Sequence, residues 1–85
     1  MNNKQRKVLE KIFHRPTLAS IKYNEVESLL KSLGVNVDIS RKGSNVFFEY
    51  NGIIQNIHRP HPQNELKKYA VEDIRKFLTE IGVRP

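Results

Sequence analysis

The dipeptide Asn51-Gly52 is the feature of this sequence that most restricts its fold. Both residue types tolerate positive φ angles, which the two central positions of a tight hairpin turn require. The flanking segments, residues 45–50 and 53–58, are rich in β-branched and aromatic residues, a composition that favours strands. The sequence therefore predicts a β-hairpin whose two strands are joined by this turn.

A third strand is expected immediately before the hairpin. Val35, Val37 and Ile39 are separated by single polar residues, so one face of this segment is apolar and the other polar. Residues 41–44, with the sequence Arg-Lys-Gly-Ser, are interpreted as the turn that leads into the next strand. Three antiparallel strands that follow one another in this way form a meander.

One helix is predicted before the meander. Its apolar residues recur at helical spacing: Val26, Leu29, Leu30 and Leu33. Asn24 and Glu27 stand where a capping pair could begin the helix, and Gly34 is expected to end it. A strand therefore follows this helix almost directly.

A second helix is predicted after the meander. Its apolar residues show the same periodicity and are Val71, Ile74, Phe77, Leu78 and Ile81. Gly82 is expected to end this helix. Residues 58–62 include two prolines, which lack the backbone donor and push their predecessors towards extended conformations. A stiff loop is therefore expected between the third strand and the last helix.

The N-terminal segment has the pattern of a short amphipathic helix over residues 4–15, ended by Pro16. We interpret residues 1–20 as an N-terminal helical arm with a connector, and residues 21–85 as the folded domain. The two helices around the meander bury their apolar sides most simply on one face of the sheet. The predicted fold is α+β, with two layers, the order α-β-β-β-α and the other sheet face uncovered.

The charge balance points to a polyanionic partner. Fifteen lysines and arginines stand against nine acidic residues, which gives a net charge of +6. Nucleic acid is the first partner to consider, although a charged surface that serves only solubility is the competing interpretation. The absence of cysteine excludes disulfides, thiolate metal sites and cysteine nucleophiles. No apolar stretch is long enough to span a membrane, so a cytoplasmic location is expected.

Three local patterns resemble a known family. They are the helix end at residues 29–34, the Arg-Lys-Gly-Ser turn before a strand, and His61-Pro62 followed by Glu65, Lys67 and Lys68. In this order and spacing, residues 21–83 resemble the HicA toxins of toxin–antitoxin systems. The resemblance implies a double-stranded-RNA-binding-like fold and a ribonuclease that cleaves messenger RNA without a metal or cofactor. It also implies silencing by a HicB-like antitoxin that occupies the active face.

One position departs from the family pattern. The residue after Gly-Ser is usually a histidine, regarded as catalytic, whereas this chain has Asn45. An amide can form hydrogen bonds but cannot exchange protons near neutral pH, so the catalytic role is not carried over to Asn45. Three explanations are open: a natural branch that uses other groups, an engineered histidine-to-asparagine change, or a member that binds RNA without cleaving it.

His58 and His61 are the candidate catalytic residues, because imidazole can accept and donate protons near neutral pH. The candidate RNA-binding residues are Arg41, Lys42, Ser44, Arg59, Lys67 and Lys68. The competing interpretations are an ordinary edge-strand residue for His58, a helix-capping turn for His61, and solvated surface charges for the cations. For the chain as a whole, the alternatives are a non-catalytic RNA-binding module, an inactivated toxin, and a partner of an acidic protein.

The neighbours Phe47 and Phe48 must point to opposite faces of their strand. One is expected in the core and the other on the uncovered face, where it could stack on a base or contact the antitoxin. The sequence alone does not assign the two faces.

Overall fold

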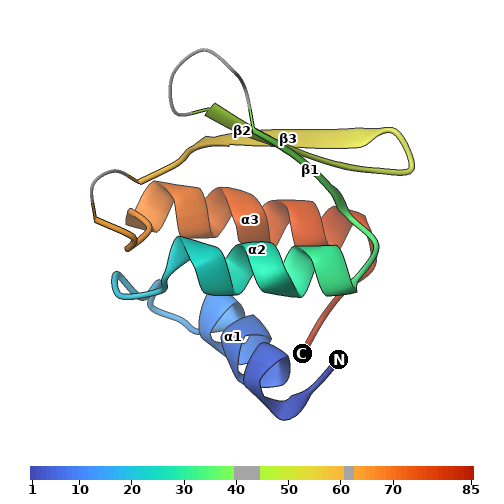
Figure 1. The fold of residues 1–85 in the computed structure, drawn as a ribbon. Helices are drawn as coiled ribbons and strands as arrows, with labels where there is room; N and C mark the ends of the chain where they lie inside the picture. The colour runs from blue at the N-terminus through green and yellow to red at the C-terminus, as the bar shows by residue number, and fades with distance from the viewer. Residues whose placement is uncertain (40–44, 61–62) are drawn as a thin grey trace.

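The computed structural model describes residues 1–39, 45–60 and 63–85. Its elements, in chain order, are α1 (Asn3–Phe13), α2 (Tyr23–Ser32), β1 (Asn36–Ile39), β2 (Asn45–Tyr50), β3 (Ile53–His58) and α3 (Lys68–Glu80). The strands form one antiparallel sheet in the order β1-β2-β3. Helices α2 and α3 lie side by side against one face of this sheet (Figure 1). The predicted α+β class and the order α-β-β-β-α are confirmed.

The alternation along β2 assigns the two faces of the sheet. Val46 and Phe48 are fully buried and face the helices, where the Phe48 ring centroid lies 6.1 Å from that of Phe77 in α3. Ile57 of β3 is opposed to Val46 and is also buried. Phe47 points to the opposite side and keeps 39% of its surface exposed. Phe48 is therefore the core residue, and Phe47 lies on the uncovered face.

The hairpin turn has the predicted geometry. Asn51 has a φ of 51° and Gly52 a φ of 82°, so both central residues are in the left-handed region that this turn needs. The Glu49 carboxylate accepts hydrogen bonds from the Gly52 N–H (3.0 Å) and the Asn36 side-chain amide (2.8 Å). Both hydrogen bonds lower the pKa of Glu49, and the one from the Gly52 N–H has the larger effect. A charged Glu49 thus ties the turn to β1.

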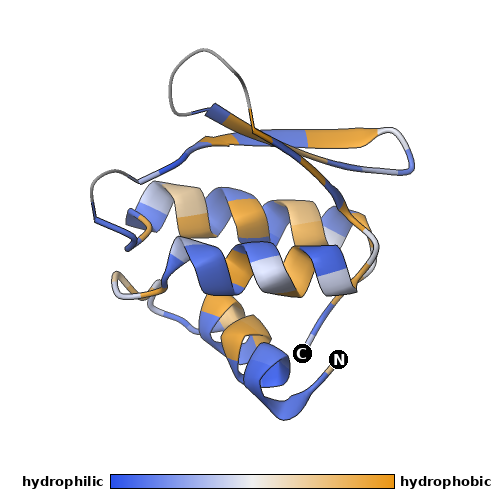
Figure 2. Cartoon of the chain, in the orientation of Figure 1, coloured by the Kyte–Doolittle hydropathy of each residue, from blue (hydrophilic) through white to orange (hydrophobic). Residues whose placement is uncertain are grey.

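Helix α1 forms a third layer, on the side of α2 and α3 that faces away from the sheet (Figure 1). Its apolar side consists of Val8, Leu9 and Ile12, all buried in the common core. Figure 2 shows the remaining surface of α1 to be largely hydrophilic. The division of the chain at residue 20 stays a prediction, but α1 shares its core with the rest of the fold.

A buried arginine fixes the end of α1. Arg75 of α3 is only 7% exposed, and its Nε donates to the backbone oxygen of Ile12 (2.8 Å). Its Nη2 donates to the His14 carbonyl (3.3 Å) and the Thr17 hydroxyl oxygen (2.9 Å). The Arg75 guanidinium therefore donates hydrogen bonds to oxygens at and beyond the C-terminus of α1, and these bonds join α1 to α3.

The start of α2 differs from the sequence-based expectation. The helix begins at Tyr23, and no side-chain hydrogen bond caps it, so the predicted capping pair of Asn24 and Glu27 is wrong. Instead, the Tyr23 N–H donates to the backbone oxygen of Asn64 (2.7 Å). A short antiparallel bridge between Lys22 and Glu65 continues this pairing. A segment that is distant in sequence therefore supplies the acceptor that a local cap would have provided.

Candidate functional site

Several candidate residues gather at one end of the molecule. Strand β2 begins there, strand β3 ends there, and α2 and α3 both start there, on the left of Figure 1. The antiparallel order of the strands and the short connections to the helices produce this arrangement. The first residue of β2, Asn45, and the last residue of β3, His58, therefore lie near the N-terminus of α3.

Asn45 and His58 are directly opposed in the β2–β3 ladder. Both are exposed, whereas their neighbours Val46 and Ile57 are buried against the helices. Asn45 and His58 therefore project together from the uncovered face. Directly opposed residues of an antiparallel pair have Cβ atoms about 4.5–5.5 Å apart, so the amide and the imidazole are neighbours. This pair can combine a proton acceptor with a hydrogen-bond donor.

The rest of the uncovered face combines one aromatic ring with polar side chains. Phe47 is opposed to Asp38 on β1 and to Asn56 on β3, and both partners are exposed. Glu49 and the 66%-exposed Ile54 form the next opposed pair towards the hairpin. The described strands contain no lysine or arginine. Positive charge for a nucleic acid must therefore come from loops and helices.

Arg59 follows His58 and lies over an aromatic ring. Its guanidinium carbon is 5.2 Å from the centroid of the Tyr23 ring, a cation–π distance. Tyr23 is 1% exposed, and its hydroxyl has no hydrogen-bond partner among the described residues. Burial raises the pKa of Tyr23 to about 12; the Glu27 carboxylate adds to the rise and Arg59 opposes it. Tyr23 is thus a neutral support for Arg59 rather than a base.

Tyr23 was not predicted as a site residue. Nothing in the local sequence distinguishes it from an ordinary residue in the first turn of an amphipathic helix. Its place beside Arg59 depends on how the end of β3 passes the start of α2, which only the tertiary structure reveals.

Lys67 and Lys68 stand at the N-terminus of α3. Both are exposed, and the first turn of this helix contains no acidic residue. Free backbone N–H groups and the helix dipole favour an anion at such a terminus. The two lysines border an open depression of about 640 Å³ whose other lining residues are Ala19, Pro60, Gln63, Glu65 and Leu66. They share an end of the fold with His58, but they belong to the helical layer.

Four of the candidate residues lie outside the residues that the structure describes. Arg41, Lys42 and Ser44 lie in residues 40–44, and His61 lies in residues 61–62, both outside the described residues. Their proposed roles stay predictions. His14, to which no function was assigned, has a local contact in which its Nδ1 lies 3.0 Å from the Pro16 carbonyl oxygen.

A sequence-family profile described as the HicA toxin of bacterial toxin–antitoxin systems matches residues 23–83, which is more than two thirds of the chain. The chain belongs to the HicA toxin family. The matched part of this HicA chain extends from the start of α2 to just beyond α3 and leaves α1 outside. No curated protein and no solved structure matches the chain.

Membership identifies this HicA chain as a toxin of a toxin–antitoxin system, and an antitoxin partner follows from that class. In the described residues, no helix has the length and apolar character to cross a bilayer.

Proposed function

We propose that this HicA chain is a cytoplasmic endoribonuclease that cleaves messenger RNA without a metal, with His58 as the proton acceptor. The observation that carries the proposal is the opposed pair of Asn45 and His58 on the uncovered face of the sheet. Family membership supports a toxin that acts on messenger RNA.

The chemistry assigns one task to each group. Neutral His58 accepts the proton of a ribose 2′-hydroxyl, and the oxygen attacks the adjacent phosphorus. The bond from phosphorus to the 5′-oxygen breaks, leaving a 2′,3′-cyclic phosphate, and the departing oxygen takes a proton. His61 is the proposed donor of that proton. The Asn45 amide donates a hydrogen bond to a non-bridging oxygen, where negative charge develops.

Cations around the pair balance the phosphate charge. Arg59, Lys67 and Lys68 are candidate cations at this end of the fold, and each can neutralise a phosphate along a bound strand. Arg41, Lys42 and Ser44 are proposed to contribute from the loop before β2. The contact between Arg59 and the Tyr23 ring supports a defined position for one of these charges.

A HicB-like antitoxin is proposed to cover the same face. Phe47 and Ile54 are exposed apolar residues on it, at 39% and 66% of their surfaces. Apolar side chains on an exposed sheet face suit a protein interface. An antitoxin bound there would exclude RNA from His58.

A pair of matched variants tests the proposal. His58→Ala removes the acceptor, and Asn56→Ala removes an exposed polar side chain from the same face and strand. We expect the unmodified chain and Asn56→Ala to arrest growth and to cleave RNA in the presence of a metal chelator. His58→Ala should lose at least about a hundredfold in cleavage rate, the usual contribution of a general base. Full cleavage by folded His58→Ala would eliminate this assignment.

Asn45 itself favours one second candidate, a HicA member that binds RNA without cleaving it. Such a chain would retain intact RNA in a salt-sensitive complex, and neither variant would alter the length of the RNA.

A further inference from the structure

The positive charge of this chain is concentrated in its N-terminal segment. Residues 1–20 contain five of the fifteen lysines and arginines but only one of the nine acidic residues. They therefore contribute +4 of the net charge of +6, and residues 21–85 contribute only +2. Most of the net charge thus lies in a segment that the HicA family match does not include.

Three lysines form a stripe along α1. Lys4, Lys7 and Lys11 are spaced three and four residues apart, which places them on one side of a helix. All three are exposed, and the apolar residues Val8 and Ile12 are buried against the other helices. These three residues are called the α1 lysine stripe.

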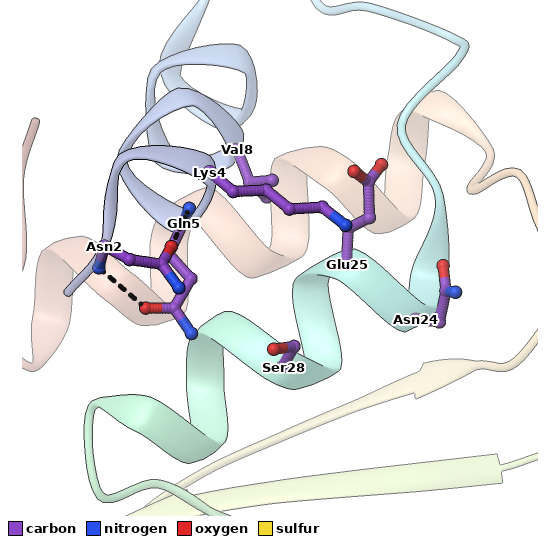
Figure 3. Close-up of a pocket in the computed structure, with 7 residues that line it drawn as sticks. All are labelled: Asn2, Lys4, Gln5, Val8, Asn24, Glu25 and Ser28. Atoms are coloured by element: carbon purple, nitrogen blue, oxygen red, sulfur yellow. Dashed lines mark hydrogen bonds between the residues drawn. The ribbon is translucent and has the colours of Figure 1, made fainter.

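The stripe has little internal compensation. Within the described ranges, the ion pair closer than 4.0 Å joins Lys31 to Glu27 and involves no residue of α1. Figure 3 shows Lys4 extending towards Glu25 across a small pocket of about 210 Å³ between α1 and α2, whereas Lys7 and Lys11 do not line this pocket. Like charges at this spacing destabilise a helix. Mutual repulsion among the three lysines is therefore unfavourable for α1, and a bound anion would relieve it.

The position of α1 is fixed at both ends. Asn2 and Gln5 form a capping box at its start, with hydrogen bonds of 2.8 and 3.1 Å. Arg75 holds its last turn through the Ile12 carbonyl. The lysine stripe thus belongs to a helix with defined ends, and α1 lies on the side of the helical layer that faces away from the sheet (Figure 1).

We propose that the α1 lysine stripe is a docking surface for the ribose-phosphate backbone of RNA, separate from the candidate catalytic pair. The proposal rests on the proposed function in that RNA is the substrate. The described strands have no lysine or arginine, and their uncovered face carries Asp38 and Glu49, so it attracts a polyanion weakly. The stripe supplies the long-range attraction that the sheet lacks.

The burial of the apolar side of α1 favours RNA over a membrane. A basic amphipathic helix binds a lipid surface by inserting its apolar side. Here Val8, Leu9 and Ile12 are buried against α2 and α3 and cannot insert while the fold is intact. A repetitive phosphate chain matches a row of exposed lysines without needing an apolar contact.

The test compares charge-neutral and charge-preserving variants in the His58→Ala background, so that cleavage does not disturb the binding measurement. Lys7→Gln/Lys11→Gln should weaken binding of a long single-stranded RNA roughly tenfold at about 0.1 M salt. Loss of two phosphate contacts should also reduce the slope of log affinity against log salt by about 1.4. Lys7→Arg/Lys11→Arg should restore both quantities.

A single-site control separates the stripe from net charge in general. Lys11 and Lys31 are each the basic residue in the last turn of their helices, so Lys11→Gln and Lys31→Gln each remove one charge and a helix-end interaction. Lys31→Gln also removes the exposed ion pair with Glu27, which should contribute little to RNA binding. We expect only Lys11→Gln to change the salt slope. Equal effects of the two variants would overturn the proposal, because they would indicate net charge alone.

Two further outcomes are decisive. Unchanged RNA affinity in the folded double glutamine variant, including a case in which only antitoxin binding weakens, would contradict RNA docking at the stripe. If the unmodified chain leaves RNA intact but the double variant still loses affinity, docking stands and the ribonuclease proposal fails. Circular dichroism spectra matching those of the parent chain establish that α1 remains folded.

Discussion

Asn45 and His58 are directly opposed residues of β2 and β3, on the face of the sheet away from α2 and α3. The position at which the family resemblance led us to expect a histidine, and the histidine of β3, are therefore cross-strand neighbours. A proton acceptor at either position reaches a similar point above the sheet, because opposed Cβ atoms are about 4.5–5.5 Å apart. In the proposed mechanism, the acceptor lies on β3, and Asn45 keeps a supporting hydrogen bond.

Placing a histidine at position 45 should increase activity. Asn45→His would place two imidazoles across one strand pair, so that one can accept and the other donate a proton. We expect a gain in cleavage rate of at least about a hundredfold, the lower end of the range of about 10²–10⁴ that an added acid or base supplies, and a bell-shaped pH profile. The rate of RNA cleavage by the purified variant, measured against pH, checks this. An unchanged rate and profile would show that His58 does not act at this pair.

Phe47 offers a test of base stacking on the uncovered face. Phe47→Ser should weaken binding of single-stranded RNA by about 1–3 kcal/mol if a base stacks on the ring. Ile54→Ser is the control, since Ile54 is on the same face, is more exposed at 66%, and lies towards the hairpin turn. Fluorescence titration with labelled RNA measures both. Equal losses for the two variants would argue against a specific stacking contact.

Arg75 should be essential for stability although it is charged. Arg75→Ala removes the donors to Ile12, His14 and Thr17, including the donor of the buried hydrogen bond to the Ile12 carbonyl. We expect a loss of about 3 kcal/mol in the free energy of unfolding, measured by urea denaturation. Lys76→Ala, at the exposed neighbouring position, should cost less than about 0.5 kcal/mol. A loss that small for Arg75→Ala would mean that α1 is not held by this contact.

Tyr23 should limit stability at alkaline pH. Its folded pKa of about 12 lies above the ordinary value of 10.0, so the unfolded chain loses the phenolic proton first. The contribution of Tyr23 to the free energy of unfolding is therefore fully present below about pH 10 and is lost as pH rises towards 12. Tyr23→Phe should remove this loss and raise the free energy of unfolding near pH 7 by about 1 kcal/mol, because the buried hydroxyl lacks a described partner.

The control for this prediction is Tyr69→Phe. Tyr69 is 48% exposed, so water can form hydrogen bonds with its hydroxyl. Denaturant titrations at pH 7 and at several alkaline values compare the two variants. Destabilisation by Tyr23→Phe near neutral pH would show that the hydroxyl has a partner after all.

Local patterns predicted most of the fold. Alternation at Val35, Val37 and Ile39, together with the positive-φ turn at Asn51-Gly52, was enough to predict the meander, because these signals depend on neighbouring residues only. The start of α2 could not be predicted in this way. Its first amide is satisfied by Asn64, some forty positions along the chain, so a search for a local cap chose Asn24 and Glu27 instead.

The candidate site, too, could be predicted only in part from the sequence. His58 was recognised as a candidate from its residue type, but the register that opposes it to Asn45 required the paired strands. Tyr23 contacts Arg59, and Arg75 donates a hydrogen bond to the end of α1. Both contacts join segments that are distant in sequence, and helical periodicity does not predict such contacts. The sequence therefore predicted the scaffold better than the environment of its polar side chains.

The chemical nature of the cleaved ends tests the central claim most directly. The purified chain is incubated with a defined RNA in excess chelator, and the 3′ ends of the fragments are identified by mass spectrometry. Attack by the 2′-hydroxyl with His58 as acceptor predicts 2′,3′-cyclic phosphate ends from the unmodified chain and from Asn56→Ala, and their near absence from His58→Ala. Cyclic phosphate ends formed equally by folded His58→Ala, or intact RNA with the unmodified chain, would contradict the account.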